Sequence, residues 1–81
     1  MIVVLADAAD ARGFALAGAF VRRCRTREDV VACLRRMTTG EEVASAVLMS
    51  APMYALAAAE VDAWRDRPNA PPLLVLPATG S

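Results

Sequence analysis

The run Ile2-Val3-Val4-Leu5-Ala6, five consecutive apolar residues directly before Asp7, decides the fold of this 81-residue chain. The run has no polar residue at alternate positions, so it is typical of a strand buried on both faces of a parallel sheet. Three further apolar stretches predict the other strands: Ala19 to Val21, Val43 to Met49, and Leu73 to Leu76. The chain therefore has one central strand and three candidates to pair around it.

The most clearly marked helix runs from Thr26 to Met37. Thr26 can cap its N-terminus, and Asp29 follows at the spacing of a capping box. Gly40 stands where a helix ends. Acidic residues in the first turn and arginines in the last turn also suit the helix dipole.

Two more helices are predicted between the strands. Ser50-Ala51-Pro52 is a start signal for a single helix that runs to about Arg65. Phe14 to Ala17 can form only a short helix, because Gly18 follows it. The inner side of the longer helix is expected to carry Met53, Leu56, Ala57, Val61 and Trp64.

Strands and helices thus alternate along the whole chain, starting and ending with a strand. The right-handed crossover rule then predicts a four-stranded parallel sheet in the order 2-1-3-4, with helices on both faces. We expect a single small α/β domain over residues 1–81, Rossmann-like or receiver-like in type.

Charge balance excludes some partners. Nine arginines offset nine acidic residues, and the chain has no histidine. A net charge of zero gives no overall positive field to attract nucleic acid or an anionic membrane. The apolar run at the N-terminus is far too short for a signal peptide or a membrane span. We therefore expect a soluble, cytoplasmic protein without direct membrane insertion or nucleic-acid binding.

Acidic residues after the first strand raise one possibility of a metal site. Asp7 and Asp10 could hold Mg²⁺, as the acidic pocket of a receiver domain does. A receiver also needs an aspartate after the middle strand, where this chain has Met49-Ser50, and a lysine, which the chain lacks. No glycine-rich phosphate loop follows the first strand either.

Cys24 and Cys33 are the two cysteines, nine positions apart, which matches neither a redox motif nor a zinc site. Arginines around Cys24 could activate it as a nucleophile. However, it follows the second strand, whereas a phosphate-carrying cysteine follows the first. We interpret both cysteines as reduced and structural, and we predict no catalytic, cofactor-binding or metal-binding residues.

The arginines cluster locally around the start of the marked helix. A charge run of this kind is either a solvated strand end or a patch that pairs with carboxylates on a partner. We favour the patch, because guanidinium groups are weakly hydrated and bind carboxylates with two hydrogen bonds. The predicted partner-binding residues are Arg22, Arg23, Arg25, Arg27 and Arg35.

The segment Gly13-Phe14-Ala15-Leu16-Ala17-Gly18, after a strand and an acidic turn, resembles the start of the F subunit of the V/A-type rotary ATPases, which carries GF-x-LAG there. The acidic helix start at Arg27-Glu28-Asp29, the strand Val47 to Met49 and the last strand from Leu73 to Pro77 follow in the same order and at similar spacing.

The resemblance implies a non-catalytic central-stalk (rotor) subunit of a proton- or sodium-translocating ATPase or ATP synthase. Its partner would be the D subunit, the coiled-coil shaft of the central stalk, which we call the shaft subunit. Through the shaft it would act on the catalytic A/B-type hexamer, in the soluble V1/A1 sector peripheral to the membrane. The family carries a C-terminal segment that influences ATP hydrolysis. This chain stops at Ser81, so either the sequence is cut short there or that segment is absent, and both alternatives stay open for its regulatory role.

Two alternatives remain open from the sequence. One is a stand-alone protein-interaction domain of similar fold, and the other is a divergent response-regulator receiver.

Overall fold

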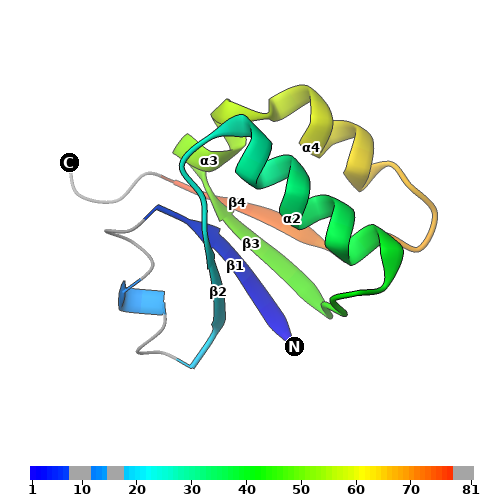
Figure 1. Cartoon of the computed structure of the whole chain (residues 1–81), viewed down its shortest axis with the longest axis horizontal. Helices are drawn as coiled ribbons and strands as arrows, with labels where there is room; N and C mark the ends of the chain where they lie inside the picture. Colours follow the sequence, from blue (N-terminus) through cyan, green and yellow to red (C-terminus); the bar gives the residue numbers. More distant parts are fainter. Residues whose placement is uncertain (8–11, 15–17, 78–81) are drawn as a thin grey trace.

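The computed structural model describes residues 1–7, 12–14 and 18–77. Its four strands form one all-parallel sheet in the order β2-β1-β3-β4, which confirms the predicted topology (Figure 1). The elements are β1 (Ile2–Ala6), β2 (Phe20–Arg23), α2 (Arg27–Thr39), β3 (Ala46–Ser50), α3 (Ala51–Leu56), α4 (Ala58–Arg65) and β4 (Leu73–Leu76).

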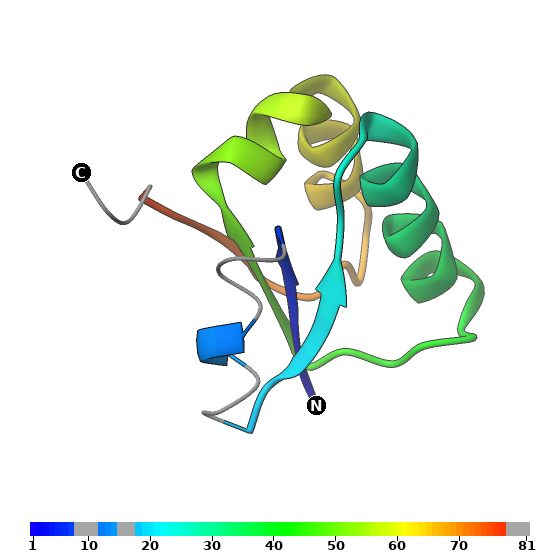
Figure 2. The same ribbon diagram turned by 60° about the vertical axis from the view of Figure 1, so that its left-hand side comes forward.

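The central strand β1 is buried as its sequence predicts, with Val3 to Ala6 fully inaccessible to solvent. On one face of the sheet, α2, α3 and α4 cover a core that includes Leu5, Met49 and Trp64 (Figure 2). On the other face, Phe14 from the helical turn at residues 12–14 packs against Val4 and Ala6. Helical structure therefore lies on both faces, although Ala15 to Ala17 of the predicted short helix lie outside the described residues.

The predicted capping box on α2 is confirmed. The Asp29 amide donates to Thr26 Oγ1 at 3.2 Å, and the Thr26 amide donates to Asp29 Oδ2 at 3.2 Å. The helix ends at Gly40, whose φ of 86° is the left-handed conformation that glycine adopts without steric cost. Thr26 and Gly40 therefore set the bounds of this element from the sequence alone.

The single helix predicted up to Arg65 is wrong, because two helices occupy this stretch. The helical conformation is interrupted at buried Ala57, which has φ −146° and ψ 43°. The Ala57 amide donates back to the Tyr54 carbonyl at 3.1 Å. α3 starts directly at the end of β3 without a loop, so the strand sets its direction, and both α3 and α4 pack against α2. The break lets both helices bury their apolar sides, and Tyr54 Oη bridges it by donating to Asp62 Oδ1 at 2.8 Å.

Strand bounds also differ from the prediction in two places. β2 extends to Arg23, because Leu5 and Ala6 of β1 supply register partners for Arg22 and Arg23. β3 begins only at Ala46, and Val43 is exposed in the preceding loop. None of the helices in the described part of the chain is long and apolar enough to cross a membrane.

Candidate partner-binding surface

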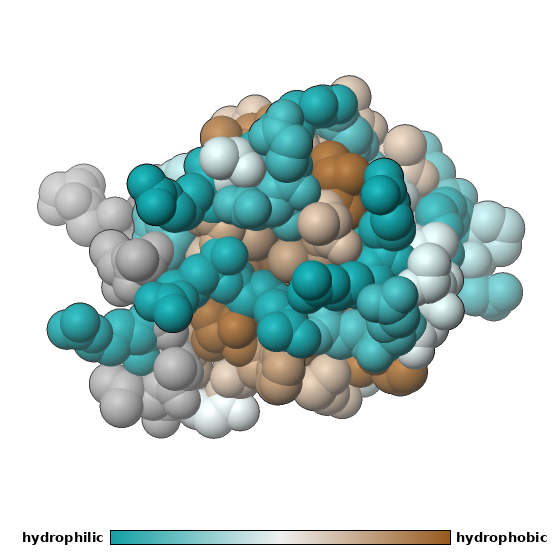
Figure 3. All heavy atoms as spheres, in the orientation of Figure 1, coloured by the Kyte–Doolittle hydropathy of each residue, from teal (hydrophilic) through white to brown (hydrophobic). Residues whose placement is uncertain are grey.

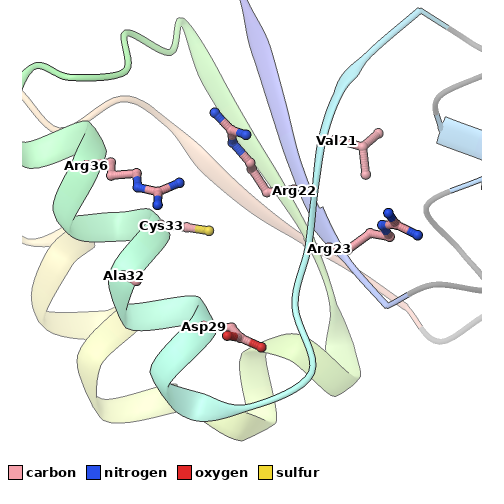
Figure 4. Close-up of a pocket in the computed structure, with 7 residues that line it drawn as sticks. All are labelled: Val21, Arg22, Arg23, Asp29, Ala32, Cys33 and Arg36. Atoms are coloured by element: carbon pink, nitrogen blue, oxygen red, sulfur yellow. The ribbon is translucent and has the colours of Figure 1, made fainter.

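A pocket of about 410 Å³ opens between β2 and α2, and we call it the arginine pocket (Figure 4). Alternation along β2 divides its side chains. Arg22 lies on the α2 side of the strand, whereas Val21 and Arg23 lie on the opposite side. The lining residues are Val21, Arg22, Arg23, Asp29, Ala32, Cys33 and Arg36.

Arg22 has an internal carboxylate partner. Its Nε donates to Glu42 Oε1 at 2.8 Å, and its terminal nitrogen pairs with the same oxygen. Glu42 is only 7% exposed, although it lies in the loop after α2. The hydrogen bond to Glu42 raises the pKa of Arg22, against a smaller opposing effect of burial. The Arg22 guanidinium also lies 4.5 Å from the centre of the Phe20 ring. This guanidinium therefore anchors the loop after α2 to the sheet.

Arg23 and Arg25 are both exposed at the end of β2 and in the loop that follows. Within the part of the chain that the structure describes, neither guanidinium forms an ion pair. The backbone amide of Arg25 donates to Asp29 Oδ2 at 2.9 Å, which orders the loop without engaging the side chain. The guanidinium groups of these two arginines are open to an external carboxylate, as is that of exposed Arg35 on α2.

Arg27 and Arg35 project from α2 toward α4. Arg27 Nε donates to Glu60 Oε2 at 2.6 Å, and this hydrogen bond lowers the pKa of Glu60. Arg35 lines a groove of about 510 Å³ between the two helices, which we call the helix groove. The five predicted arginines therefore extend from the far face of the sheet, along α2, to the helix groove.

The helix groove is mainly apolar, with polar side chains at its rim. Figure 3 shows this side of the molecule coloured by hydropathy, in the orientation of Figure 1. Thr38 organises one end of it. Trp64 Nε1 donates to Thr38 Oγ1 at 3.1 Å, and Arg67 donates to the same oxygen at 3.0 Å. The groove is lined by Val31, Leu34, Arg35, Thr38, Glu60, Ala63, Trp64 and Arg67.

Sequence reasoning missed two residues that shape this surface. Arg36 lies on the same side of α2 as Cys33 and lines the arginine pocket; its spacing of three residues from Cys33 was the available signal. Glu42 carried no signal of burial, because nothing local distinguishes it from the neighbouring Glu41.

The positions weighed for metal or receiver chemistry have other surroundings. Asp10 lies outside the described residues. Ser50, where a receiver would have its aspartate, is buried and caps α3 by accepting from the Met53 amide at 3.4 Å. Among the described residues, no group of three or more acidic, histidine or cysteine side chains is placed to hold a metal ion.

Comparison with known proteins supplies the family. A comparison with curated proteins gave no match. The family model of the ATP synthase F/14-kDa subunit matches residues 2–81, almost the whole chain. This confirms the resemblance to the F subunit of the V/A-type enzymes. The chain therefore belongs to the ATP synthase F/14-kDa subunit family and is a component of a rotary ATPase.

Proposed function

We propose that the chain is a non-catalytic central-stalk subunit that binds the coiled-coil shaft subunit of its rotary ATPase. Membership of the F/14-kDa subunit family is the observation that carries this proposal. Through the shaft the chain connects with the catalytic A/B-type hexamer. In this role it turns with the shaft in the soluble, cytoplasmic sector of a proton- or sodium-translocating complex and influences its rate of ATP hydrolysis.

The free guanidinium groups support a particular docking surface. Arg23 lies at the end of β2 and Arg25 in the loop that leads into α2, and each can form a bidentate pair with a carboxylate on a partner helix. Arg27 and Arg35 extend this basic surface along α2 to the helix groove. We place Arg22 at its inner edge, where the ion pair with Glu42 holds β2 in position.

The first experiment tests the partner. The chain is co-expressed with the shaft subunit from the same genome, purified through a tag on the shaft, and weighed by light scattering. We expect a 1:1 complex. A chain that stays monomeric with the shaft in excess would contradict the proposal.

The second experiment tests the docking surface with matched charge reversals. Arg25→Glu removes an open guanidinium and adds a repelling carboxylate, so we expect the affinity for the shaft to fall at least about tenfold. Arg65→Glu makes the same charge change at the exposed end of α4 and serves as the control. Equal affinities for the two variants would remove the loop from the docking surface.

Arg22→Glu is a poor reporter of docking. The new carboxylate would stand beside buried Glu42, so the variant would lose stability whether or not Arg22 contacts a partner. Arg23→Glu avoids this problem, because Arg23 lies on the other side of β2.

A further inference from the structure

Cys24 and Cys33 form a buried thiol pair that the rotor function does not use. Their sulfur atoms lie 3.9 Å apart and share a hydrogen bond. Cys24 follows β2 directly and Cys33 lies in the middle of α2, so the pair joins the edge of the sheet to the helix that covers it. Both are free thiols, with Cys24 fully buried and Cys33 7% exposed.

The two thiols differ in their access to solvent. Cys33 lines the arginine pocket, and Figure 4 shows its sulfur on the side of α2 that faces β2. Cys24 lies behind it, and its sulfur also contacts the Arg22 carbonyl oxygen at 3.8 Å. A small reagent that enters the pocket can therefore reach Cys33, whereas Cys24 is fully buried and does not line the pocket.

The electrostatic surroundings separate the thiols in the same direction. The hydrogen bond from Cys24 lowers the pKa of Cys33, and Arg36 and Arg22 lower it further, against burial and the charge of Glu42. The hydrogen bond to Cys33 and burial raise the pKa of Cys24. Asp29 is the other charged group that lines the pocket beside Arg22, Arg23 and Arg36. Cys33 is therefore the more acidic thiol of the pair, and the thiolate is the form that reacts.

We propose that Cys24 and Cys33 are a peroxide-responsive disulfide site, in which Cys33 is attacked first through the arginine pocket and Cys24 resolves it. The geometry carries this assignment, because the two sulfurs need to approach by only about 2 Å to reach bonding distance. A side-chain rotation at each residue supplies a movement of that size.

The chemistry balances with hydrogen peroxide as the oxidant. The Cys33 thiolate attacks one peroxide oxygen, so an S–O bond forms, the O–O bond breaks, and the leaving hydroxide takes up a proton to become water. The Cys24 sulfur then attacks the sulfenic acid sulfur of Cys33. The S–S bond forms as the S–O bond breaks, and the departing hydroxide leaves as water with the Cys24 proton. Two thiols and one peroxide thus give one disulfide and two waters, and a dithiol reverses the change.

The full chain is treated with hydrogen peroxide at neutral pH, quenched, unfolded and alkylated without reduction. We expect a monomer whose mass is lower by two hydrogen atoms and that takes up no alkylating reagent, with full labelling restored by dithiothreitol. Two thiols that still take up alkylating reagent after peroxide treatment would overturn the proposal, as would a disulfide that links two chains.

Single variants test the order of attack. Cys24→Ser removes the resolving thiol, so Cys33 should stop at the sulfenic acid and be trapped by dimedone. Cys33→Ser should label at least about tenfold more slowly, because Cys24 is fully buried. Equal labelling rates would overturn the assignment of Cys33 as the attacked thiol. Circular dichroism establishes that each variant is folded, and the experiment on the unaltered chain stands without them.

Discussion

Glu42 is a buried carboxylate with a single partner. Arg22 donates to its Oε1 atom, while its Oε2 atom has no hydrogen-bond partner among the described residues. The stability of this region therefore depends on the Arg22 guanidinium, because a buried charge without compensation is costly.

Arg22→Ala should lower the free energy of unfolding by about 1–3 kcal/mol. This is less than for a fully enclosed pair, because the Arg22 side chain is 35% exposed and solvent screens it. Arg23→Ala on the same strand is the control and should change stability by no more than about 0.5 kcal/mol. Urea unfolding measures both, and adding Glu42→Leu to Arg22→Ala should recover most of the loss. No recovery would mean that Arg22 stabilises the chain through its contact with Phe20 instead.

The lowered pKa of Cys33 makes a prediction about pH. Its rate of alkylation in the folded chain should rise with pH around a midpoint lower than that of an ordinary cysteine. Cys24→Ala removes the hydrogen bond that contributes most to the lowered pKa of Cys33. The midpoint of Cys33 alkylation should therefore move to higher pH in this variant. Alkylation with a small neutral reagent that fits the pocket is quenched at timed intervals, and mass spectrometry gives the rate at each pH. A midpoint that does not change in Cys24→Ala would remove Cys24 as the cause.

At the scale of a single element, the capping box on α2 combines two local effects. Thr26 satisfies the amide of Asp29, and the Asp29 carboxylate satisfies the amides of Arg25 and Thr26. These backbone hydrogen bonds lower the pKa of Asp29, with the bond from Arg25 the largest cause. Since a lowered carboxyl pKa contributes stability above its unfolded value, that contribution is present above about pH 4 and lost as the pH falls further.

Thr26→Ala should lower the free energy of unfolding by about 1 kcal/mol, because one amide at the start of α2 loses its partner. Thr26→Ser keeps the hydroxyl, so its free energy of unfolding should differ from that of the unaltered chain by no more than about 0.3 kcal/mol. Urea unfolding at pH 7 compares the variants. Asp29→Asn at pH 7 and pH 3 tests the charge, and its stability should depend less on pH than that of the unaltered chain.

At the scale of the whole molecule, a domain of 81 residues buries a limited core, so its stability should respond strongly to a bound partner. If the shaft subunit binds only the folded chain, a shaft concentration of 100 times the dissociation constant should add about 2.7 kcal/mol to the free energy of unfolding. Thermal unfolding at increasing shaft concentration measures this. Arg65→Glu should follow the unaltered chain, whereas Arg25→Glu should need at least about tenfold more shaft for the same shift. An unfolding temperature that does not depend on the shaft would contradict binding to the folded chain.

Local patterns in the sequence were enough to determine most of the fold. The apolar run at β1, the capping residues of α2 and the alternation of strands with helices depend on neighbours along the chain, and the handedness of crossovers then sets the strand order. The family resemblance also rested on a contiguous segment, Gly13 to Gly18. These features could be predicted because burial and capping leave a residue pattern within one element.

Only the tertiary structure decided which side chains meet across elements. The pairing of β2 with β1 extends the strand to Arg23, so that alternation along the strand puts Arg22 and Arg23 on opposite faces. The predicted helix is interrupted at Ala57, where no glycine or proline signals a break, and both of its parts pack against α2. The burial of Glu42 and the approach of Cys24 to Cys33 likewise depend on how a loop and a helix settle on the sheet. Contacts of this kind join residues far apart in the chain, so no local pattern in the sequence encodes them.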